Sequence, residues 1–233
     1  MVWITIYYTN MEKKITDFQN YLSRYNLTDS NLGYINRLNI NLLYKNHNNI
    51  NFRVGEKYVL NLLRKVRITK VDLTDNFDFT GFAHQFFNLC CEKNYTISIY
   101  GGSSDEIKSF VNKINSIYNL NIVDYFDGFQ PEIFYLDRVK TVNSDIKILG
   151  LGNPKQDDIL LKLAQSNFLG IYTCGGFISQ ESRFKNNFYD NYSFLPRWAI
   201  RSIFEKNHFK RVFFSSLTSL FKIIRLGYRN SKN

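Results

Sequence analysis

Residues 148–160 have the residue types of an anion-binding corner. They read as a buried strand that ends in a glycine turn and leads directly into a helix. Gly150, Gly152 and Asn153 tolerate the tight backbone conformations that such a turn needs. Pro154 suits the first position of a helix, where a missing N–H costs nothing.

The first turn of that helix carries Lys155, Gln156 and Asp157. Unsatisfied backbone N–H groups and the positive end of the helix dipole face outward there, so the corner favours a phosphate. The alternative to a phosphate site is an ordinary βα loop, with which the glycines alone are also compatible.

Two further glycine pairs follow expected strands: Gly101-Gly102 and Gly175-Gly176. Ligands of open parallel sheets bind beyond the carboxyl ends of the strands, so we expect the three corners to line one ligand site with backbone N–H groups. None of them matches the dinucleotide motif GxGxxG with a downstream acid, or the P-loop motif GxxxxGK[ST].

Short apolar runs alternate with longer helical patterns, which predicts βα units and a mostly parallel sheet in an α/β fold. The expected strands are 2–7, 33–38, 66–71, 96–100, 121–125, 145–151 and 169–173. The expected helices are 12–24, 39–45, 56–65, 77–93, 105–118, 131–143, 154–165, 196–205 and 208–226.

The net charge of +10 is concentrated at one end of the chain. Residues 183–233 contain eleven Lys and Arg residues against two acids, whereas residues 1–182 contain 19 against 18. We therefore expect a nearly neutral domain over 1–182 and a basic appendage over 183–233. The three cysteines and three histidines show neither a disulfide framework nor metal-ligand spacing, which favours a reducing cytoplasm and no metal site.

Residues 208–226 place an apolar face beside lysines and arginines, as in a helix that lies in a membrane interface. A terminal helix docked on the sheet is the alternative. No segment reaches the roughly 18 apolar residues of a membrane span, and no nucleic-acid recognition motif accompanies the basic surface. We expect a soluble or peripheral protein that does not bind nucleic acid.

The motifs resemble those of the WecG/TagA/CpsF family of bacterial glycosyltransferases. Residues 150–157 are similar to its GxGxPKQE motif, with Asp157 in place of Glu. Residues 97–102 resemble its strand that ends in Gly-Gly, and 122–129 resemble its segment that ends in Gly-Tyr-Phe. Residues 67–73 and 34–42 resemble two further segments. The latter keeps Asn39 but has Arg37 where Thr is usual.

The resemblance implies a Rossmann-like fold of the type called GT-E with a C-terminal appendage. It also implies inverting transfer of a sugar from a UDP-sugar to a polyprenyl-diphosphate-linked saccharide in surface polysaccharide (capsule or cell-envelope) biosynthesis. No cofactor or essential metal is implied, because the UDP-sugar is the donor substrate. The location implied is the cytoplasmic face of the plasma membrane, where a homo-oligomer is a further possibility.

The same resemblance implies roles for individual residues. Gln156, Arg67 and Asp72 are the expected catalytic residues, with Gln156 binding sugar or nucleotide hydroxyls. The expected substrate-binding residues are Asn39, Arg37, Gly101, Gly102, Gly152, Asn153, Pro154, Lys155, Gly175, Gly176, Arg201 and Arg211. Arginine suits a diphosphate because its planar guanidinium can bind two oxygens at once.

One segment departs from the family pattern. Family members usually carry an Asp-Gly-(Ile/Met)-Gly segment whose Asp is the catalytic base, but residues 51–55 read Asn-Phe-Arg-Val-Gly and hold no carboxylate. Glu56 or Asp72 could take the place of that base, or the acceptor phosphate could. The alternative is a non-catalytic relative that binds a nucleotide-sugar or partner enzymes as an assembly subunit.

Overall fold

The computed structural model describes residues 16–36, 39–44, 49–65 and 76–183. Within these ranges, six strands form a single sheet of order β2-β1-β6-β5-β3-β4, and every strand pairing in it is parallel. The strands are β1 (Asn31–Ile35), β2 (Ile50–Val54), β3 (Thr96–Gly101), β4 (Asn121–Phe126), β5 (Ile146–Gly150) and β6 (Ile171–Thr173). The expected α/β fold with a parallel, Rossmann-like sheet is therefore confirmed.

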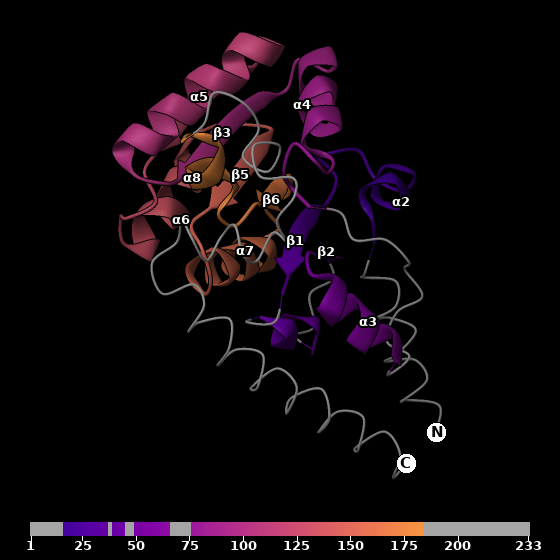
Figure 1. Ribbon diagram of the computed structural model, residues 1–233. Coiled ribbons are helices and arrows are strands. Elements are labelled where there is room, and N and C mark those ends of the chain that lie inside the picture. The colour runs from indigo at the N-terminus through magenta and orange to yellow at the C-terminus, as the bar shows by residue number, and fades with distance from the viewer. Residues whose placement is uncertain (1–15, 37–38, 45–48, 66–75, 184–233) are drawn as a thin grey trace.

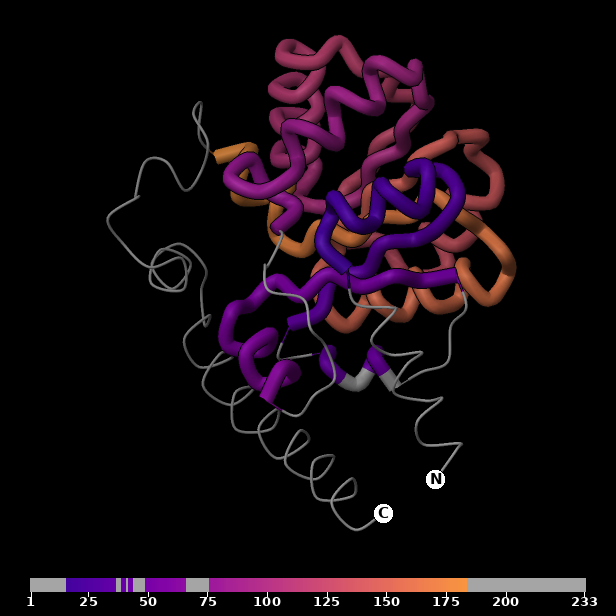
Figure 2. Tube along the Cα trace, turned by 90° about the vertical axis from the view of Figure 1, so that its right-hand side faces the viewer, coloured from indigo at the N-terminus to yellow at the C-terminus, as the bar shows by residue number. Residues whose placement is uncertain are grey.

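Helices cover both faces of the sheet (Figure 1). One face packs against α2 (Phe18–Leu22), α4 (Ala83–Glu92), α5 (Ser104–Tyr118) and α8 (Phe177–Glu181). The other face packs against the 3-10 helix η1 (Ile40–Tyr44), α3 (Lys57–Lys65), α6 (Glu132–Thr141) and α7 (Lys155–Gln165). Figure 2 shows the same three layers from the side, with α5 and α7 on opposite sides of the strands.

The two apolar cores differ in chemistry. The core beneath α2, α4, α5 and α8 is rich in aromatic rings: Phe77 packs within 4.8–5.5 Å, centroid to centroid, of Phe86, Phe82 and Phe177. The core beneath α3 and α7 is mainly aliphatic. Both cores bury the central strands β5 and β6 on each face, which is why these strands read as continuous apolar runs.

Strand β1 spans Asn31–Ile35 instead of the expected 33–38, and the Asn31 side chain anchors its start. The Asn31 Nδ2 donates to the Phe168 carbonyl oxygen at 2.9 Å, and its Oδ1 accepts from the Ile171 N–H at 3.0 Å. The amide thus replaces a backbone peptide unit at the start of the strand, a role that a polar residue in the sequence does not reveal.

Several predicted element bounds were wrong. The helix expected over 77–93 begins only at Ala83, because Asp78 closes a turn by accepting from the Thr80 N–H at 2.9 Å and from the Gly81 N–H through its carbonyl oxygen at 3.0 Å. The helix expected over 39–45 is the 3-10 helix η1, and the one expected over 12–24 is present within the described residues as α2.

Strand β2 and helix α8 were not predicted at all. Strand β2 contains two buried polar residues, and each donates a hydrogen bond within the fold: Asn51 to the Ser30 hydroxyl at 2.7 Å, and Arg53 to the Thr173 carbonyl oxygen at 3.3 Å. The expected strands 2–7 and 66–71 and the expected helices 196–205 and 208–226, including the amphipathic tail, lie outside the described residues. Among the helices that are described, none has the length and apolar character needed to cross a membrane.

Candidate functional site at the carboxyl edge of the sheet

The topology of the sheet marks one edge as the place for a ligand. The connection after β3 leads to β4 on one side, whereas the connection after β5 leads to β6 on the other. Ligands of open parallel sheets bind where neighbouring connections diverge in this way. Gly101 and Gly150, the last residues of β3 and β5, are register partners at that point.

The corner that leads into α7 has open space around its glycine. Gly152 has a φ of +72°, and a Cβ placed on it would meet no atom within 4 Å. Its carbonyl oxygen accepts from the Gln156 N–H at 3.0 Å, and α7 begins at Lys155 with Pro154 as its N-cap residue. No side-chain hydrogen bond caps this end of the helix. The corner therefore combines free space at Gly152 with an uncapped helix N-terminus.

Gln156 is completely buried at this corner, with 0% of its surface exposed. Its Nε2 donates to the Asn153 Oδ1 at 2.8 Å, and the Asn153 Nδ2 lies 3.5 Å from the Asn36 Oδ1. The Gln156 Oε1 has no hydrogen-bond partner among the described residues. A buried amide oxygen without a donor is costly, so this atom is a ready acceptor for a hydroxyl or N–H group of a ligand.

Asn39 is placed beside this cluster but has no amide proton left for a ligand. Its Nδ2 donates to the Tyr34 carbonyl oxygen at 2.8 Å and to the Asp157 Oδ2 at 3.0 Å, and its Oδ1 accepts from the Asn36 N–H at 2.8 Å. Asn39 therefore closes the turn after β1 and ties it to α7. Its geometry indicates a structural role next to the site.

Lys155 directs its ammonium group to the chain itself. The Nζ donates to the carbonyl oxygens of Gly128, at 3.0 Å, and of Gln130, and it lies 4.6 Å from the centre of the Tyr135 ring. Burial lowers the pKa of Lys155, and the nearby carboxylates of Asp127 and Glu132 oppose that shift.

The Gly101-Gly102 corner is filled by protein atoms. A Cβ on Gly101 would lie 2.4 Å from the Gly150 carbonyl oxygen and 2.8 Å from the Ile178 Cδ1 of α8. Gly128 packs against the same corner, and its N–H donates to the Gly102 carbonyl oxygen at 2.7 Å. These glycines allow close packing of β3, β5 and α8.

The N-terminus of α5, which follows this corner, is capped by the chain's own carboxylate. Glu106 and Ser103 form a reciprocal capping box, in which the Glu106 Oε2 accepts from the Ser103 N–H at 2.9 Å. The same carboxylate accepts from the Ser179 hydroxyl at 2.8 Å and from Arg183 at 3.0 Å. Burial raises the pKa of Glu106, but these hydrogen bonds outweigh it and hold the pKa below its usual value. This capping box occupies the helix end beside Gly101 and Gly102, which were expected to line the ligand site.

The third corner resembles the first. Gly175 has a φ of +60°, and a Cβ on it would meet no atom within 4 Å, while Gly176 precedes α8 without a side-chain cap. The Thr173 side chain at the end of β6 is completely buried, and its Oγ1 has no hydrogen-bond partner among the described residues. The open part of the edge thus lies at Gly152 and Gly175, just after the neighbouring strands β5 and β6.

The stretch where the family pattern places a catalytic Asp is strand β2. Arg53, in this strand, has none of its surface exposed. Its guanidinium donates to the Thr173 carbonyl oxygen at 3.3 Å and lies 4.3 Å from the centre of the Phe82 ring. Val54 is buried in the aliphatic core. Residues 51–55, which contain no carboxylate, therefore belong largely to a strand whose side chains pack inside the protein.

Five of the predicted site residues lie outside the described residues: Arg37, Arg67, Asp72, Arg201 and Arg211. Sequence reasoning, in turn, did not select Asn36, Thr173 or Tyr135. The Asn36-x-x-Asn39 spacing after a strand was an available sign of a side-chain-closed turn. No pattern pointed to Thr173, because a lone Thr at the end of a strand is common.

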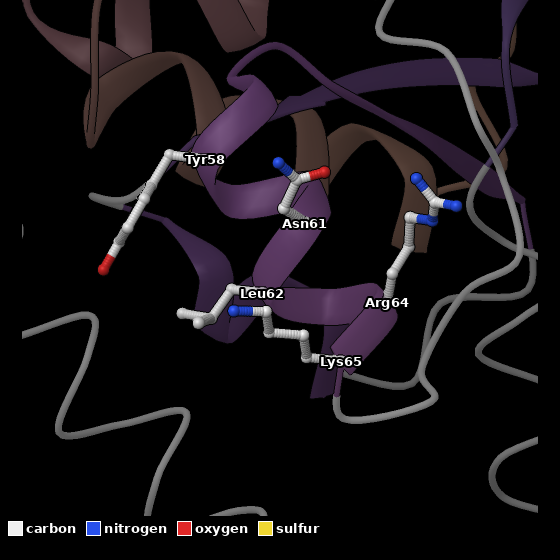
Figure 3. Close-up of a pocket in the computed structure, with 5 residues that line it drawn as sticks. All are labelled: Tyr58, Asn61, Leu62, Arg64 and Lys65. Atoms are coloured by element: carbon white, nitrogen blue, oxygen red, sulfur yellow. The ribbon is translucent and has the colours of Figure 1, made fainter.

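A pocket of about 550 Å³ lies elsewhere, on helix α3 (Figure 3). Its described lining residues all come from this helix: Tyr58, Asn61, Leu62, Arg64 and Lys65. None of them belongs to the predicted site, and the pocket supports no assignment of its own.

Together, the parallel sheet and its open edge define a Rossmann-like α/β protein, a class whose ligands bind beyond the carboxyl ends of the strands. Residues 59–233 match the sequence model of the glycosyl transferase WecG/TagA/CpsF family. The chain therefore belongs to this family and is a glycosyltransferase, which confirms the inference drawn from the motifs around Gln156.

Two relatives of known activity are similar to this chain. A UDP-Gal:alpha-D-GlcNAc-diphosphoundecaprenol beta-1,4-galactosyltransferase of Shigella boydii is 30% identical over 165 residues, which cover 66% of this chain and 68% of the relative. An N-acetylglucosaminyldiphosphoundecaprenol N-acetyl-beta-D-mannosaminyltransferase of Bacillus subtilis (strain 168) is 28% identical over 119 residues. That second match spans 50% of this chain and 44% of the relative.

Proposed function

We propose that the protein transfers a sugar from a UDP-sugar to a saccharide linked to undecaprenyl diphosphate, in the assembly of a surface polysaccharide. The observation that carries this proposal is the α7 corner, where Gly152 leaves open space and the buried Gln156 Oε1 has no donor among the described residues. The names of the two relatives supply the acceptor chemistry, since both are transferases that act on a GlcNAc-diphosphoundecaprenol.

The corner can receive the diphosphate of the donor. No side chain caps the start of α7, and the helix dipole favours negative charge at this end. The Gln156, Asp157 and Asp158 N–H groups donate to the carbonyl oxygens of Gly152 and Pro154. Gln156 would then accept a hydrogen bond from a hydroxyl of the sugar or nucleotide. Arg67, Arg201 and Arg211 are proposed to neutralise the diphosphate and Arg37 to contact the donor, on the strength of the family resemblance.

The proposed transfer inverts the anomeric configuration. UDP-galactose carries an α-linked sugar, and the Shigella boydii relative is named for a β-1,4 product. An inverting displacement needs a base for the acceptor hydroxyl and donors for the departing diphosphate. We assign Asp72 as that base. We further propose that the reaction needs no metal or cofactor and takes place at the cytoplasmic face of the plasma membrane, where the basic segment 183–233 binds anionic lipid.

Turnover measured with purified full-length protein tests this function. A panel of UDP-sugars, each with a GlcNAc-diphosphate acceptor that carries a short lipid, should yield a β-linked disaccharide with at least one donor. Activity in the presence of a chelator would support the metal-free reaction. Binding of UDP without turnover on the whole panel would favour the non-catalytic alternative, and no binding of UDP would contradict the proposal itself. Flotation with liposomes that contain anionic lipid tests the membrane contact.

A further inference from the structure

The hydroxyl of Thr173, the last residue of β6, is buried without a hydrogen bond. The residue has 0% of its surface exposed, and its Oγ1 has no hydrogen-bond partner among the described residues. Ser98 of β3 is equally buried, but its hydroxyl shares a hydrogen bond of 2.9 Å with that of Ser144. Valine has nearly the shape of threonine, so an unpartnered threonine hydroxyl costs stability that valine would not. The Thr173 hydroxyl is therefore a candidate for contact with a ligand.

The sheet places the Thr173 side chain on the face that α7 covers. Thr173 is the register partner of Leu149 in β5 and follows Ile171 by two residues. Side chains of register partners, and of residues two apart in a strand, point to the same face of a sheet. Leu149 and Ile171 belong to the aliphatic core together with Leu160 of α7. The Thr173 hydroxyl therefore lies in the layer between the sheet and α7, at the carboxyl end of β6.

Gln156, the second residue of α7, is buried in the same layer and also has an unused polar atom. Its Nε2 donates to Asn153, whereas its Oε1 has no partner among the described residues, so Gln156 and Thr173 do not bond to each other. The amide oxygen can only accept a hydrogen bond, while the hydroxyl can donate or accept one. Hydroxyl groups of a ligand serve both atoms, which favours a ligand that carries several hydroxyls.

The backbone around Thr173 is held by neighbouring strands. Its carbonyl oxygen accepts from the buried Arg53 guanidinium at 3.3 Å, and the Cys174 N–H donates to the Leu149 carbonyl oxygen at 2.9 Å. A β-branched side chain has few rotamers, so the hydroxyl is oriented before a ligand binds. Gly175, two residues further, has open space beside its Cα, which gives the end of β6 room for a ligand.

We propose that Thr173 is a specificity-determining residue, whose hydroxyl binds a hydroxyl group of the nucleotide-sugar in the same layer as Gln156. The identity of the ligand rests on the proposed function, but the unpartnered state of the Thr173 hydroxyl in the free protein does not. A UDP-sugar offers such hydroxyl groups on its ribose and on the transferred sugar, and binding measurements distinguish these two sources.

The first test uses the protein without ligand. Thr173→Val removes the hydroxyl and keeps the shape of the side chain, and Ser98→Ala removes the buried hydroxyl that has a partner. The Tm of Thr173→Val should equal or exceed that of the wild type, whereas the Tm of Ser98→Ala should fall by about 2–4 °C. A Tm of Thr173→Val lowered as far as that of Ser98→Ala would overturn the proposal, because the hydroxyl would then stabilise the free protein.

The second test measures affinities for UDP and for the UDP-sugar that supports turnover. Thr173→Val should bind the UDP-sugar about tenfold more weakly than the wild type, while Thr173→Ser and Ser98→Ala should bind it nearly as well. An equal loss for UDP would assign the contact to the ribose, and a loss for the UDP-sugar alone would assign it to the transferred sugar. Wild-type affinity of Thr173→Val for both ligands would overturn the proposal. Failure of the wild type to bind UDP would instead overturn the proposed function, and with it the ligand.

The third test separates a direct contact from a general distortion of the site. Donors that each lack one hydroxyl, on the ribose or on the sugar, are bound to the wild type and to Thr173→Val. The donor without the contacted hydroxyl should bind both proteins equally, whereas the other donors should keep the tenfold difference. The same loss of affinity for every deoxy donor would overturn the direct contact, since a distorted site does not discriminate between hydroxyl groups.

Discussion

The side chains of Asn39 and Asp157 are joined by a 3.0 Å hydrogen bond that connects the turn after β1 to the first turn of α7. The two residues are 118 positions apart in the chain, and both are buried, with 5% and 3% of their surfaces exposed. The bond orients the Asn39 amide, which in turn holds the Asn36 N–H and the Tyr34 carbonyl oxygen. One carboxylate therefore links the end of β1 to the start of α7 at the candidate site.

Replacing this carboxylate should destabilise the protein. Asp157→Ala leaves a buried Asn39 amide proton without an acceptor, so we expect a loss of about 1–3 kcal/mol in the free energy of unfolding. Urea denaturation measures this loss. Asp158→Ala, one residue further and more exposed, is the control and should cost less than about 0.5 kcal/mol. Equal losses for the two variants would contradict the role of the Asn39–Asp157 bond.

A second carboxylate, Asp124, should make stability depend on pH. Burial raises its pKa, but hydrogen bonds from Arg138, at 2.7 Å, and from Tyr100, at 2.8 Å, outweigh burial, and the pKa of Asp124 lies below its usual value. A carboxyl group whose pKa is lowered by folding stabilises the protein above its unfolded-state pKa of about 3.9. That contribution is lost as the pH falls through the lower pKa of the folded state.

We therefore expect Asp124→Asn to be less stable than the wild type at pH 7, by about 1–3 kcal/mol, and the difference to shrink below about pH 4. Urea denaturation of both proteins between pH 3 and 7 gives this comparison directly. Asp137→Asn, an exposed residue on α6, serves as the control. A stability difference that stays constant down to pH 3 would show that Asp124 does not titrate with a lowered pKa.

The sequence predicts the fold correctly where the pattern of apolar residues along the chain matches the burial of those residues in the structure. Strands β3, β4 and β5 were placed within one residue of their bounds because apolar runs and glycine turns mark them. Strand β2 was not, because Arg53 and Asn51 break the apolar run, and only the fold reveals their contacts with Thr173, Phe82 and Ser30.

The candidate site was predictable only as a set of residue types. The sequence identified the α7 corner, but the expectation of three equivalent glycine corners did not anticipate which would be filled. Gly101 and Gly102 read like Gly175 and Gly176, yet contacts with Gly128 and Ile178, distant in sequence, and with the nearby Glu106 occupy the first pair. Packing between remote segments decides whether a glycine gives space to a ligand or to the protein.

This difference between the corners predicts losses of stability of different size for two Gly→Ala substitutions. A methyl group on Gly101 would lie 2.4 Å from the Gly150 carbonyl oxygen at a φ of +153°, so Gly101→Ala should lower stability by at least about 2–3 kcal/mol. Gly152→Ala meets open space and incurs only left-handed backbone strain of about 1–2 kcal/mol. Thermal denaturation should rank the variants in this order, and Gly152→Ala, though folded, should bind UDP more weakly. The reverse order of stability would contradict the packing at Gly101.

Gln156 should show a separation between stability and activity. Its Oε1 is buried without a partner among the described residues, so the amide already carries a desolvation cost in the free protein. Gln156→Leu removes that cost together with the 2.8 Å bond to the Asn153 Oδ1, so the free energy of unfolding should change by less than about 1 kcal/mol. The same change removes the proposed acceptor for a ligand hydroxyl, and kcat/KM should fall by about 100-fold.

Gln165→Leu, at the exposed end of α7, is the matched control and should leave kcat/KM unchanged. A Gln156→Leu variant that keeps wild-type kcat/KM would remove Gln156 from the site, while one that unfolds would assign it a structural role instead.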